Sequence, residues 1–169
     1  KWHKNVSNKI KKIDNSSKIL LDIPGIKPRT ANKINVLINK NEKIIFYYGR
    51  NSFKKYKSIP ITNPLPKINK DSRSFSISDG QYQFKLIKKT NNYIIGKSKE
   101  KFNLLEKKGL NIPYSVYDEI AQKKAYLNFL NKFKSVKFDA IGLSFIQNKN
   151  VIEVIRQKYP NIIIVAKIE

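Results

Sequence analysis

Hydrophobic residues follow two different periods along this chain of 169 residues, and each period predicts a different kind of element. Near the N-terminus they recur at helical spacing, which predicts an amphipathic helix over residues 2–13. Its helical positions are Trp2, Val6, Lys9, Ile10 and Ile13. A short apolar strand is expected over residues 18–23, and Pro24 and Gly25 then interrupt regular structure. From about residue 31, short alternating or aromatic segments separated by Asn, Gly, Pro and Lys predict a small β-rich module.

The helical period returns in the second half of the chain. Ser115, with Asp118 three residues later, matches a capping box and predicts a helix start. The expected buried face of this helix is Ile120, Ala121, Lys124, Leu127 and Leu130. A buried strand over 138–146, a helix over 148–159 and a strand over 161–167 follow. Strand, helix and strand joined by short connections form a βαβ unit, which predicts a parallel sheet with a right-handed crossover.

Two opposite charges end the last of these strands. Side chains alternate along a strand, so Lys167 and Glu169 point to one face and Ile168 to the other. The aliphatic run of residues 162–166 before them predicts a strand that is buried on both sides. A solvated ion pair at a strand end is the plain interpretation, and periodicity alone favours it.

Composition excludes several kinds of site. The chain has no cysteine, which excludes disulfides, zinc–thiolate sites and thiol catalysis. Its one histidine, His3, excludes a multi-histidine metal site. No apolar run is long enough to span a bilayer and no signal peptide is visible, so we expect a cytoplasmic protein without a membrane partner.

The formal net charge of +23 favours polyanionic partners, but the kind of basic residue argues against them. The arginines are Arg29, Arg50, Arg73 and Arg156, and the remaining positive charge is lysine spread among asparagine and isoleucine. Proteins that read nucleic acid use arginine for bidentate contacts to phosphates and guanines. A compositional bias with a basic, solvated face accounts for the charge, so we do not expect nucleic acid as a partner.

Four stretches, in order and with matching spacing, resemble pyruvate kinase over essentially the whole chain. LLDIPGIKPRT (residues 20–30) resembles that family's Asp-x-x-Gly-Pro-x-Ile-Arg-Thr segment, and SISDGQYQFKL (76–86) resembles the Asp-Gly turn of its lid domain. KKGLNIP (107–113) is similar to the Lys-Lys-Gly-Val-Asn-Leu-Pro that leads out of the lid. The fourth stretch, DAIGLSFIQ (139–147) followed by IIIVAKIE (162–169), is similar to its Asp-x-x-x-x-Ser-Phe-Val-Arg and Lys-Ile-Glu strands.

The resemblance implies an α/β fold, namely part of a (β/α) TIM-type barrel with an inserted small all-β lid domain. Residues 1–23 and 113–169 would belong to the barrel, and residues 24–112 to the lid. It also implies phosphoryl transfer from phosphoenolpyruvate to ADP, giving pyruvate and ATP, by a homotetramer. Three parallel strands cannot close a barrel of eight, and the chain has no methionine. We therefore expect an internal excerpt of the enzyme that is inactive alone.

The same resemblance implies roles for residues at the strand ends. Lys167 is similar to the catalytic lysine, which would neutralise the transferring phosphoryl group and the developing enolate. Glu169 would hold the divalent metal, Mg²⁺ or Mn²⁺, together with substrate and waters. Ser144 and Phe145 would line the substrate pocket, although Phe145 also fits a core position.

Further roles are implied around the lid. Arg29, Asp79 and Lys108 would contact the nucleotide or a phosphate, although a surface arginine, a hairpin turn and a solvated lysine are equally simple interpretations. Asp22 resembles the carboxylate that helps to seat a monovalent cation. Family members with a lysine at the position of Lys27 do without K⁺, because the ammonium is a tethered cation. K⁺ is therefore not expected to be required, unless Lys27 simply faces solvent.

Two other functions stay open. The chain could be a non-catalytic or truncated pyruvate kinase homologue that retains the fold. It could also be a basic polyanion- or nucleic-acid-binding protein built on this scaffold.

Overall fold

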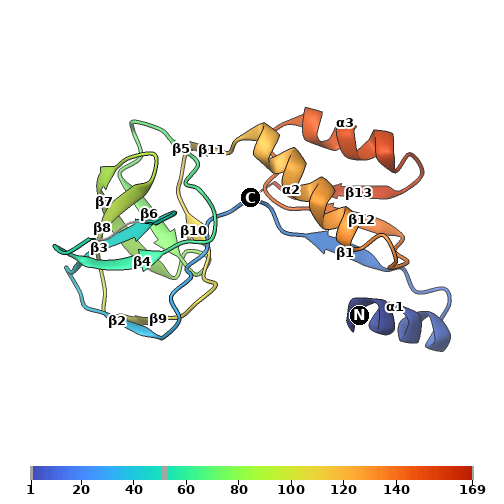
Figure 1. Ribbon diagram of the computed structural model, residues 1–169, viewed down its shortest axis with the longest axis horizontal. Helices are drawn as coiled ribbons and strands as arrows, with labels where there is room; N and C mark the ends of the chain where they lie inside the picture. The colour runs from blue at the N-terminus through green and yellow to red at the C-terminus, as the bar shows by residue number, and fades with distance from the viewer. Residues whose placement is uncertain (1, 51–52, 169) are drawn as a thin grey trace. The chain divides into compact units, whose positions relative to one another are not determined.

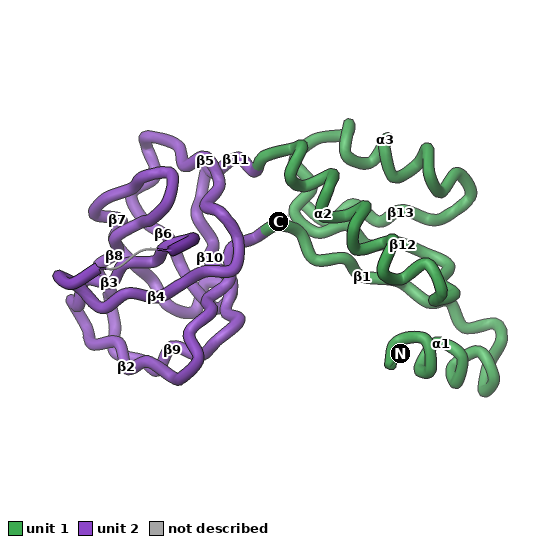
Figure 2. Tube along the Cα trace, in the orientation of Figure 1, with its two compact units in different colours: residues 1–26, 118–169 green, residues 27–117 purple. Residues whose placement is uncertain are grey.

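The computed structural model describes residues 2–50 and 53–168, and the chain divides into two compact units (Figure 2). Unit 1 consists of residues 1–26 and 118–169, and unit 2 of residues 27–117. The mixed α/β composition follows this division, because the helices lie in unit 1 and unit 2 is built from strands.

Unit 1 contains a three-stranded parallel sheet and the helices of the described chain (Figure 1). Its elements are α1 (Trp2–Ile13), β1 (Leu20–Ile23), α2 (Glu119–Lys132), β12 (Ala140–Leu143), α3 (Lys149–Lys158) and β13 (Ile163–Ala166). The strand order is β1-β12-β13, and the parallel pairing of β12 with β13 confirms the βαβ prediction. In this register Ile23, Leu143 and Ala166 lie side by side at the carboxyl ends of the strands.

The core of unit 1 forms between the sheet and the helices α2 and α3. Its fully buried members are Ile23, Tyr126, Leu130, Ile141, Leu143, Val151 and Ile155. Each helix contributes from one face, α2 through Tyr126 and Leu130 and α3 through Val151 and Ile155. No helix in the described part of the chain is long and apolar enough to cross a lipid bilayer.

The start and the buried face of α2 differ from the sequence-based prediction. Asp118 is the N-cap, since its Oδ1 accepts a hydrogen bond from the Ala121 backbone N at 2.6 Å. The predicted cap Ser115 instead lies in β11 and donates its hydroxyl to the Ile112 carbonyl at 2.7 Å. The predicted face was wrong for Ile120, which is 79% exposed, but right for Leu130, which is fully buried, and for Leu127, which packs against the core. The helix buries Gln122, Tyr126 and Leu130, since Gln122 and Tyr126 find hydrogen-bond partners below the surface.

The apolar stripe of α1 is left exposed, because polar side chains make the contacts of this helix. Ser7 donates to the Lys137 carbonyl at 2.8 Å, and Lys11 lies 3.2 Å from the Asp139 carboxylate. Trp2 and Ile13 are 69% and 87% exposed. Hydrophobic spacing therefore predicted the helix correctly, but not the face that it turns toward unit 1.

The last strand, β13, is also less buried than predicted. Its inward residue Ile164 packs on the core, whereas Ile163 and Val165 are 61% and 42% exposed. Among the described elements, β12 pairs with one edge of β13 and α3 packs against it. A strand that is covered on one face only cannot bury both sets of alternating side chains.

Unit 2 is a set of short strands (Figure 1). They are β2 (Val36–Ile38), β3 (Lys43–Tyr47), β4 (Lys57–Pro60), β5 (Lys67–Ile68), β6 (Ser74–Ile77), β7 (Tyr82–Lys89), β8 (Tyr93–Ser98), β9 (Phe102–Leu104), β10 (Leu110–Asn111) and β11 (Ser115–Val116). The largest sheet has the order β10-β6-β7-β8-β3-β4, and the pairs β11-β5 and β2-β9 complete the unit. Pro60 lies in β4, at the edge where a strand tolerates proline.

Phenylalanine rings form the centre of the core in unit 2. Phe75 and Phe84 are stacked with centroids 4.9 Å apart, and the edge of Phe46 meets both rings at 5.5 Å. Gly96 makes room for this cluster, because a Cβ atom there would lie 2.4 Å from Phe75 Cζ. Unit 2 thus has a hydrophobic core of its own, separate from that of unit 1.

Candidate functional site

The carboxyl edge of the β1-β12-β13 sheet gathers the predicted site residues of unit 1. Parallel strands end at the same edge of a sheet, so the residues that follow them lie close together. Asp22 is the penultimate residue of β1, Ser144 and Phe145 follow β12, and Lys167 follows β13. These four residues, distant in sequence, therefore meet at one edge.

An ion pair joins the first and the last strand at this edge. Lys167 Nζ lies 2.8 Å from Asp22 Oδ1 and 2.9 Å from Asp22 Oδ2. The side chains are 33% and 58% exposed, so a ligand can reach both charges. A pair this exposed contributes at most about 1 kcal/mol to stability. Gly142 of β12 leaves room between them, since a Cβ atom there would lie 3.3 Å from Asp22 Oδ1.

Backbone hydrogen bonds fix the segments that carry these side chains. Lys167 N donates to the Leu143 carbonyl at 2.9 Å, and Ile146 N donates to the Lys167 carbonyl at 3.1 Å. Ser144 N donates to the Ile23 carbonyl at 3.2 Å. The backbone position of Lys167 is therefore set by the same sheet that positions Asp22.

Two polar residues of α2, Gln122 and Tyr126, donate hydrogen bonds to the backbone of the Ser144–Phe145 segment. Gln122 Nε2 donates to the Phe145 carbonyl at 2.6 Å and to the Tyr126 hydroxyl at 2.9 Å. The Tyr126 hydroxyl in turn donates to the Ser144 carbonyl. Gln122 and Tyr126 are 2% and 0% exposed, so these bonds are shielded from water. The sequence prediction missed both residues, although their spacing of four places them on one helix face.

Phe145 has a left-handed backbone conformation, with φ of 62°. This conformation costs about 1 kcal/mol for a residue with a side chain, and it persists where surrounding contacts enforce it. Gly25 is one such contact, because a Cβ atom there would lie 2.8 Å from the Ser144 carbonyl oxygen and 3.2 Å from Phe145 Cδ2. The segment after β1 thus approaches the Ser144–Phe145 segment as closely as only a glycine permits.

Glu119 ties the start of α2 to the start of α3 beside this segment. Its carboxylate accepts from Asn148 Nδ2 at 2.6 Å and from Asn150 Nδ2 at 3.4 Å, and it pairs with Lys123 at 2.6 Å. The hydrogen bond from the Lys123 ammonium is the main cause that lowers the pKa of Glu119. Both helices therefore begin at fixed positions at the carboxyl edge of the sheet.

The predicted lid residues form a second group, within unit 2. The Arg29 guanidinium donates to the Lys107 carbonyl at 3.2 Å, and Arg29 forms a backbone bridge with Gly109. Lys108 N donates to Thr30 Oγ1 at 2.9 Å, which fixes the backbone of Lys108 next to the same segment. Residues 29–30 and 107–109 are therefore neighbours.

Lys27 does not face solvent, so the interpretation of this residue as a solvent-exposed lysine is excluded. It is 6% exposed, and its Nζ lies 3.7 Å from Asp79 Oδ1. Gly109 packs against its end, since a Cβ atom there would lie 2.8 Å from Lys27 Cε. Asp79 sits at the turn between β6 and β7, where Ser78, Asp79 and Gly80 all have positive φ, and its side chain is 93% exposed. A buried ammonium beside an exposed carboxylate is an arrangement that composition alone did not predict.

Glu169, the predicted metal ligand, lies outside the described residues. Within residues 2–50 and 53–168, no three His, Asp or Glu side chains come together in a group that could hold a metal ion. Among the described residues at this edge, Asp22 is the carboxylate in contact with Lys167.

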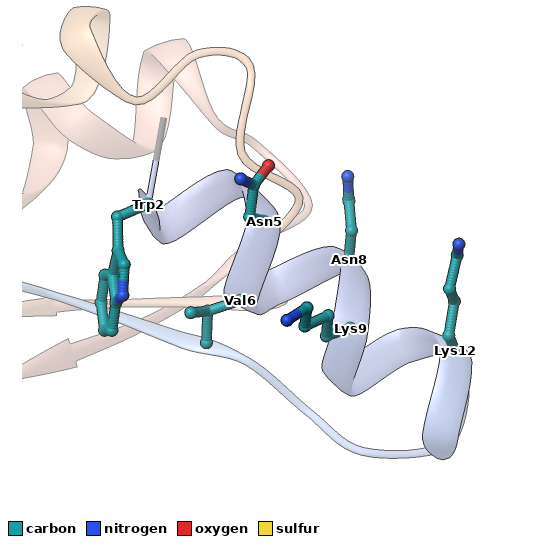
Figure 3. Close-up of a pocket in the computed structure, with 6 residues that line it drawn as sticks. All are labelled: Trp2, Asn5, Val6, Asn8, Lys9 and Lys12. Carbon is teal, nitrogen blue, oxygen red and sulfur yellow. The ribbon is translucent and has the colours of Figure 1, made fainter.

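A pocket of about 410 Å³ lies along α1, away from the predicted residues (Figure 3). It is lined by Trp2, Asn5, Val6, Asn8, Lys9 and Lys12. All of these side chains come from one helix, and Figure 3 shows Asn8 and Lys12 pointing away from Trp2 and Val6. The lining residues do not form a cluster of catalytic groups, and we assign no function to the pocket.

The fold and the site define a mixed α/β protein of the class that places charged groups at the carboxyl edge of parallel strands. Among solved structures, the pyruvate kinase of Cryptosporidium parvum is similar to this chain, with a TM-score of 0.66 and 22% sequence identity. The match covers 96% of this chain and 37% of that chain. The likeness shows a pyruvate kinase-like fold, and the chain spans little more than a third of the length of that protein.

Comparison of the sequence with protein-family profiles and with curated proteins finds no match. The structural likeness is thus a statement about the fold. What the protein does has to be argued from its own side chains.

Proposed function

We propose that this chain is part of an enzyme that transfers the phosphoryl group of phosphoenolpyruvate to ADP, giving pyruvate and ATP. The ion pair of Lys167 with Asp22, at the carboxyl edge of a parallel sheet in a pyruvate kinase-like fold, is the observation that carries the proposal. A single ammonium that a sheet holds in place, with a third of its side chain accessible, suits a reaction in which negative charge moves between oxygens.

In this reaction a β-phosphate oxygen of ADP attacks phosphorus, and the bond from phosphorus to the enol oxygen breaks. Negative charge then spreads over the phosphoryl oxygens and develops on the enolate oxygen. Lys167 is proposed to neutralise that charge, and Asp22 to orient the ammonium before the substrate arrives. Ser144 and Phe145 are proposed to form the adjoining wall of the substrate pocket, held by Gln122 and Tyr126 from α2.

A divalent metal ion, Mg²⁺ or Mn²⁺, is part of the proposal. Hard oxygen ligands suit both ions, and Mg²⁺ in particular keeps several waters and binds substrate oxygens beside one or two carboxylates. Glu169 is proposed as its protein ligand, because it follows Lys167 by two residues in the stretch that resembles the family's Lys-Ile-Glu. When bound, the ion would supply further neutralisation of phosphoryl charge.

Unit 2 is proposed to act as the lid of the enzyme, and unit 1 as part of a (β/α) barrel. Support for the lid comes from its separate core and from the grouping of Lys27, Arg29, Asp79 and Lys108 in it. Arg29, Asp79 and Lys108 are proposed to contact the nucleotide or a phosphate. Lys27 is proposed to serve as a tethered cation, so that the enzyme needs no K⁺.

The test is a coupled assay of pyruvate formation by the protein with its natural flanking sequence. Lys167→Ala is expected to lower kcat by about 100-fold or more, because the ammonium acts on charge that develops in the transition state. ADP affinity, measured by calorimetry, should change little. Lys149→Ala, which removes an exposed lysine of α3, is the matched control and should keep full activity. Near-normal turnover in Lys167→Ala would refute the catalytic assignment.

A further inference from the structure

One face of the six-stranded sheet in unit 2 carries three lysines in register. Lys97 of β8 pairs with Lys85 of β7 on one side and with Lys43 of β3 on the other. We call these three residues the lysine row. Paired residues of neighbouring strands share a face, so all three point away from the phenylalanine core. Their sequence neighbours, such as Phe84 and Ile44, point into that core.

The lysine row has no acidic partner in its own strands. Strands β3, β7 and β8 contain no Asp or Glu. Glu42 and Glu100, which flank these strands, are engaged elsewhere. Glu42 pairs with Lys57 at 2.8 Å, and Glu100 accepts from Gln83 N at 3.0 Å. Like charges that lie directly opposite each other on a sheet are destabilising, so an anion bound across the row would relieve their repulsion.

Aromatic rings stand beside the lysines on the same face. Tyr47 and Tyr93 are paired across β3 and β8, and the Phe53 ring lies 5.3 Å from each of them. Lys88 Nζ lies 5.8 Å from the centre of the Tyr93 ring. Lys88 pairs with Ile95 of β8, which lies two residues before Lys97 and so shares its face. Lys88 is therefore on this face as well.

A second lysine–aromatic contact lies at Lys43, which forms one end of the lysine row. The Tyr56 ring has Lys43 Nζ at 5.9 Å and Lys55 Nζ at 5.5 Å from its centre. Tyr47, Tyr56 and Tyr93 are all half-buried, so each ring keeps part of its surface open to a ligand. The lysine row and the Tyr47–Tyr93 pair thus lie on one face of the sheet, with the paired Ile45 and Ile95 between them.

We propose that this lysine–aromatic face binds single-stranded nucleic acid, with phosphates on the lysine row and bases on the tyrosine rings. Neighbouring strands are about 4.8 Å apart, so the three ammonium groups of the row span about 10 Å, and each can neutralise one phosphate of a bound strand. Proteins that bind single strands combine a basic track with aromatic side chains for base stacking. A compositional bias explains why the chain is rich in lysine, but not why lysines and rings share one sheet face.

The site is independent of the proposed phosphoryl transfer. None of its residues belongs to the Lys167 group in unit 1 or to the Lys27 group in unit 2. Catalysis and nucleic-acid binding can therefore fail separately, and each has its own experiment.

The first measurement is fluorescence anisotropy of a labelled 20-nucleotide oligothymidylate titrated with the 169-residue chain at 50, 100 and 200 mM salt. Three neutralised phosphates give a slope of log K against log salt of about −2 for a single strand. The affinity should accordingly fall by about 20-fold between 50 and 200 mM salt. No saturable binding at 50 mM salt would overturn the proposal.

Two triple variants with the same change of charge locate the site. Lys43→Gln with Lys85→Gln and Lys97→Gln removes the lysine row. The control, Lys33→Gln with Lys70→Gln and Lys101→Gln, removes three exposed lysines that lie outside the six strands of the sheet. The first variant should lose most of the salt dependence and bind at least 10-fold more weakly at 50 mM salt, whereas the control keeps the slope. Equal losses in both variants would overturn the assignment, because they would show diffuse charge attraction.

The aromatic part of the site has its own variant. Tyr56→Leu keeps an apolar side chain of similar reach but removes the ring, so the affinity should fall by about 5- to 100-fold at an unchanged salt slope. Unchanged affinity would refute base stacking at this ring.

Vesicles of phosphatidylcholine with one-fifth phosphatidylserine are the competing anionic surface. Displacement of the oligonucleotide by these vesicles at equal charge concentration would assign the face to lipid and overturn the proposal.

Discussion

Asp22 and Lys167 form an ion pair. We propose that it orients the Lys167 ammonium and contributes little to the stability of the fold. Asp22→Asn keeps the shape of the side chain but releases the Lys167 ammonium. The free energy of unfolding, measured with urea on the 169-residue chain, should change by less than about 1 kcal/mol, because the pair is partly exposed. In the protein with its natural flanking sequence, kcat/KM for phosphoenolpyruvate should fall by about 10- to 100-fold. A large loss of stability with intact kcat/KM would assign the pair to the fold.

Lys27 supports a prediction about ions. Its ammonium is buried and lies 3.7 Å from Asp79 Oδ1, so a positive charge is built into unit 2 at that point. In tetramethylammonium buffer with Mg²⁺, the unmodified enzyme should reach full activity without K⁺. Lys27→Glu should then make activity depend on K⁺, because the carboxylate would recruit the missing cation.

The neutral variant Lys27→Gln is the control for this experiment. It removes the charge without offering a new ligand, so its activity should be low and should not respond to K⁺. Strong stimulation of the unmodified enzyme by K⁺ would show that Lys27 does not take the place of a cation.

At the scale of elements, the segment after β1 and the segment after β12 meet at Gly25. A Cβ atom at Gly25 would lie 2.8 Å from a backbone oxygen, that of Ser144, whereas a Cβ atom at Gly109 would lie 2.8 Å from the flexible end of Lys27. Gly25→Ala should therefore lower the free energy of unfolding by about 1–3 kcal/mol, and Gly109→Ala by clearly less. Urea unfolding of both variants checks the difference, and equal effects would contradict the rigid contact at Gly25.

The sequence predicted those elements in which apolar residues recur at a regular helical or strand spacing. The helix Trp2–Ile13, the helix that follows β12 and the parallel pairing of β12 with β13 all agree with the structure. Strand β4 (Lys57–Pro60) gives only a weak signal in the sequence, because Lys57, Ser58 and Pro60 surround the single aliphatic residue Ile59. It forms nevertheless, since an edge strand needs backbone partners on one side only.

For the site, the sequence located side chains that follow strands and missed those that support them from elsewhere. Asp22 and Lys167 could be expected at one edge because both lie at the ends of parallel strands. Gln122 and Tyr126 could not, because the prediction took the apolar Ile120 as a buried position, whereas the structure buries the polar Gln122 instead. The burial of Lys27 was equally hidden, since a lysine in a lysine-rich chain gives no local sign that a turn will cover it.

At the scale of the whole molecule, the two separate cores predict two unfolding events. Phe84→Ala removes a ring from the aromatic cluster of unit 2 and should lower the stability of that unit by about 3–5 kcal/mol. Leu130→Ala should lower the stability of unit 1 by about 2–5 kcal/mol. Hydrogen exchange read by mass spectrometry would assign each loss, because only peptides of the altered unit should exchange faster. Faster exchange in both units after either change would show one cooperative core.

The pairing of β1 with β12 has a consequence for the way the protein is made. The backbone of Ile19 and the side chain of Asp139, joined by a hydrogen bond at 2.8 Å, are 120 residues apart in sequence. A ribosome that adds about 5–20 residues per second needs about 6–24 s to cover that distance. During this time the whole of unit 2 has emerged and can fold around its own core, while Leu21 and Ile23 wait without their partner strand. The nascent chain therefore carries an apolar strand that lacks its partner β12 while unit 2 is already folded, a state in which a chaperone would protect it from aggregation.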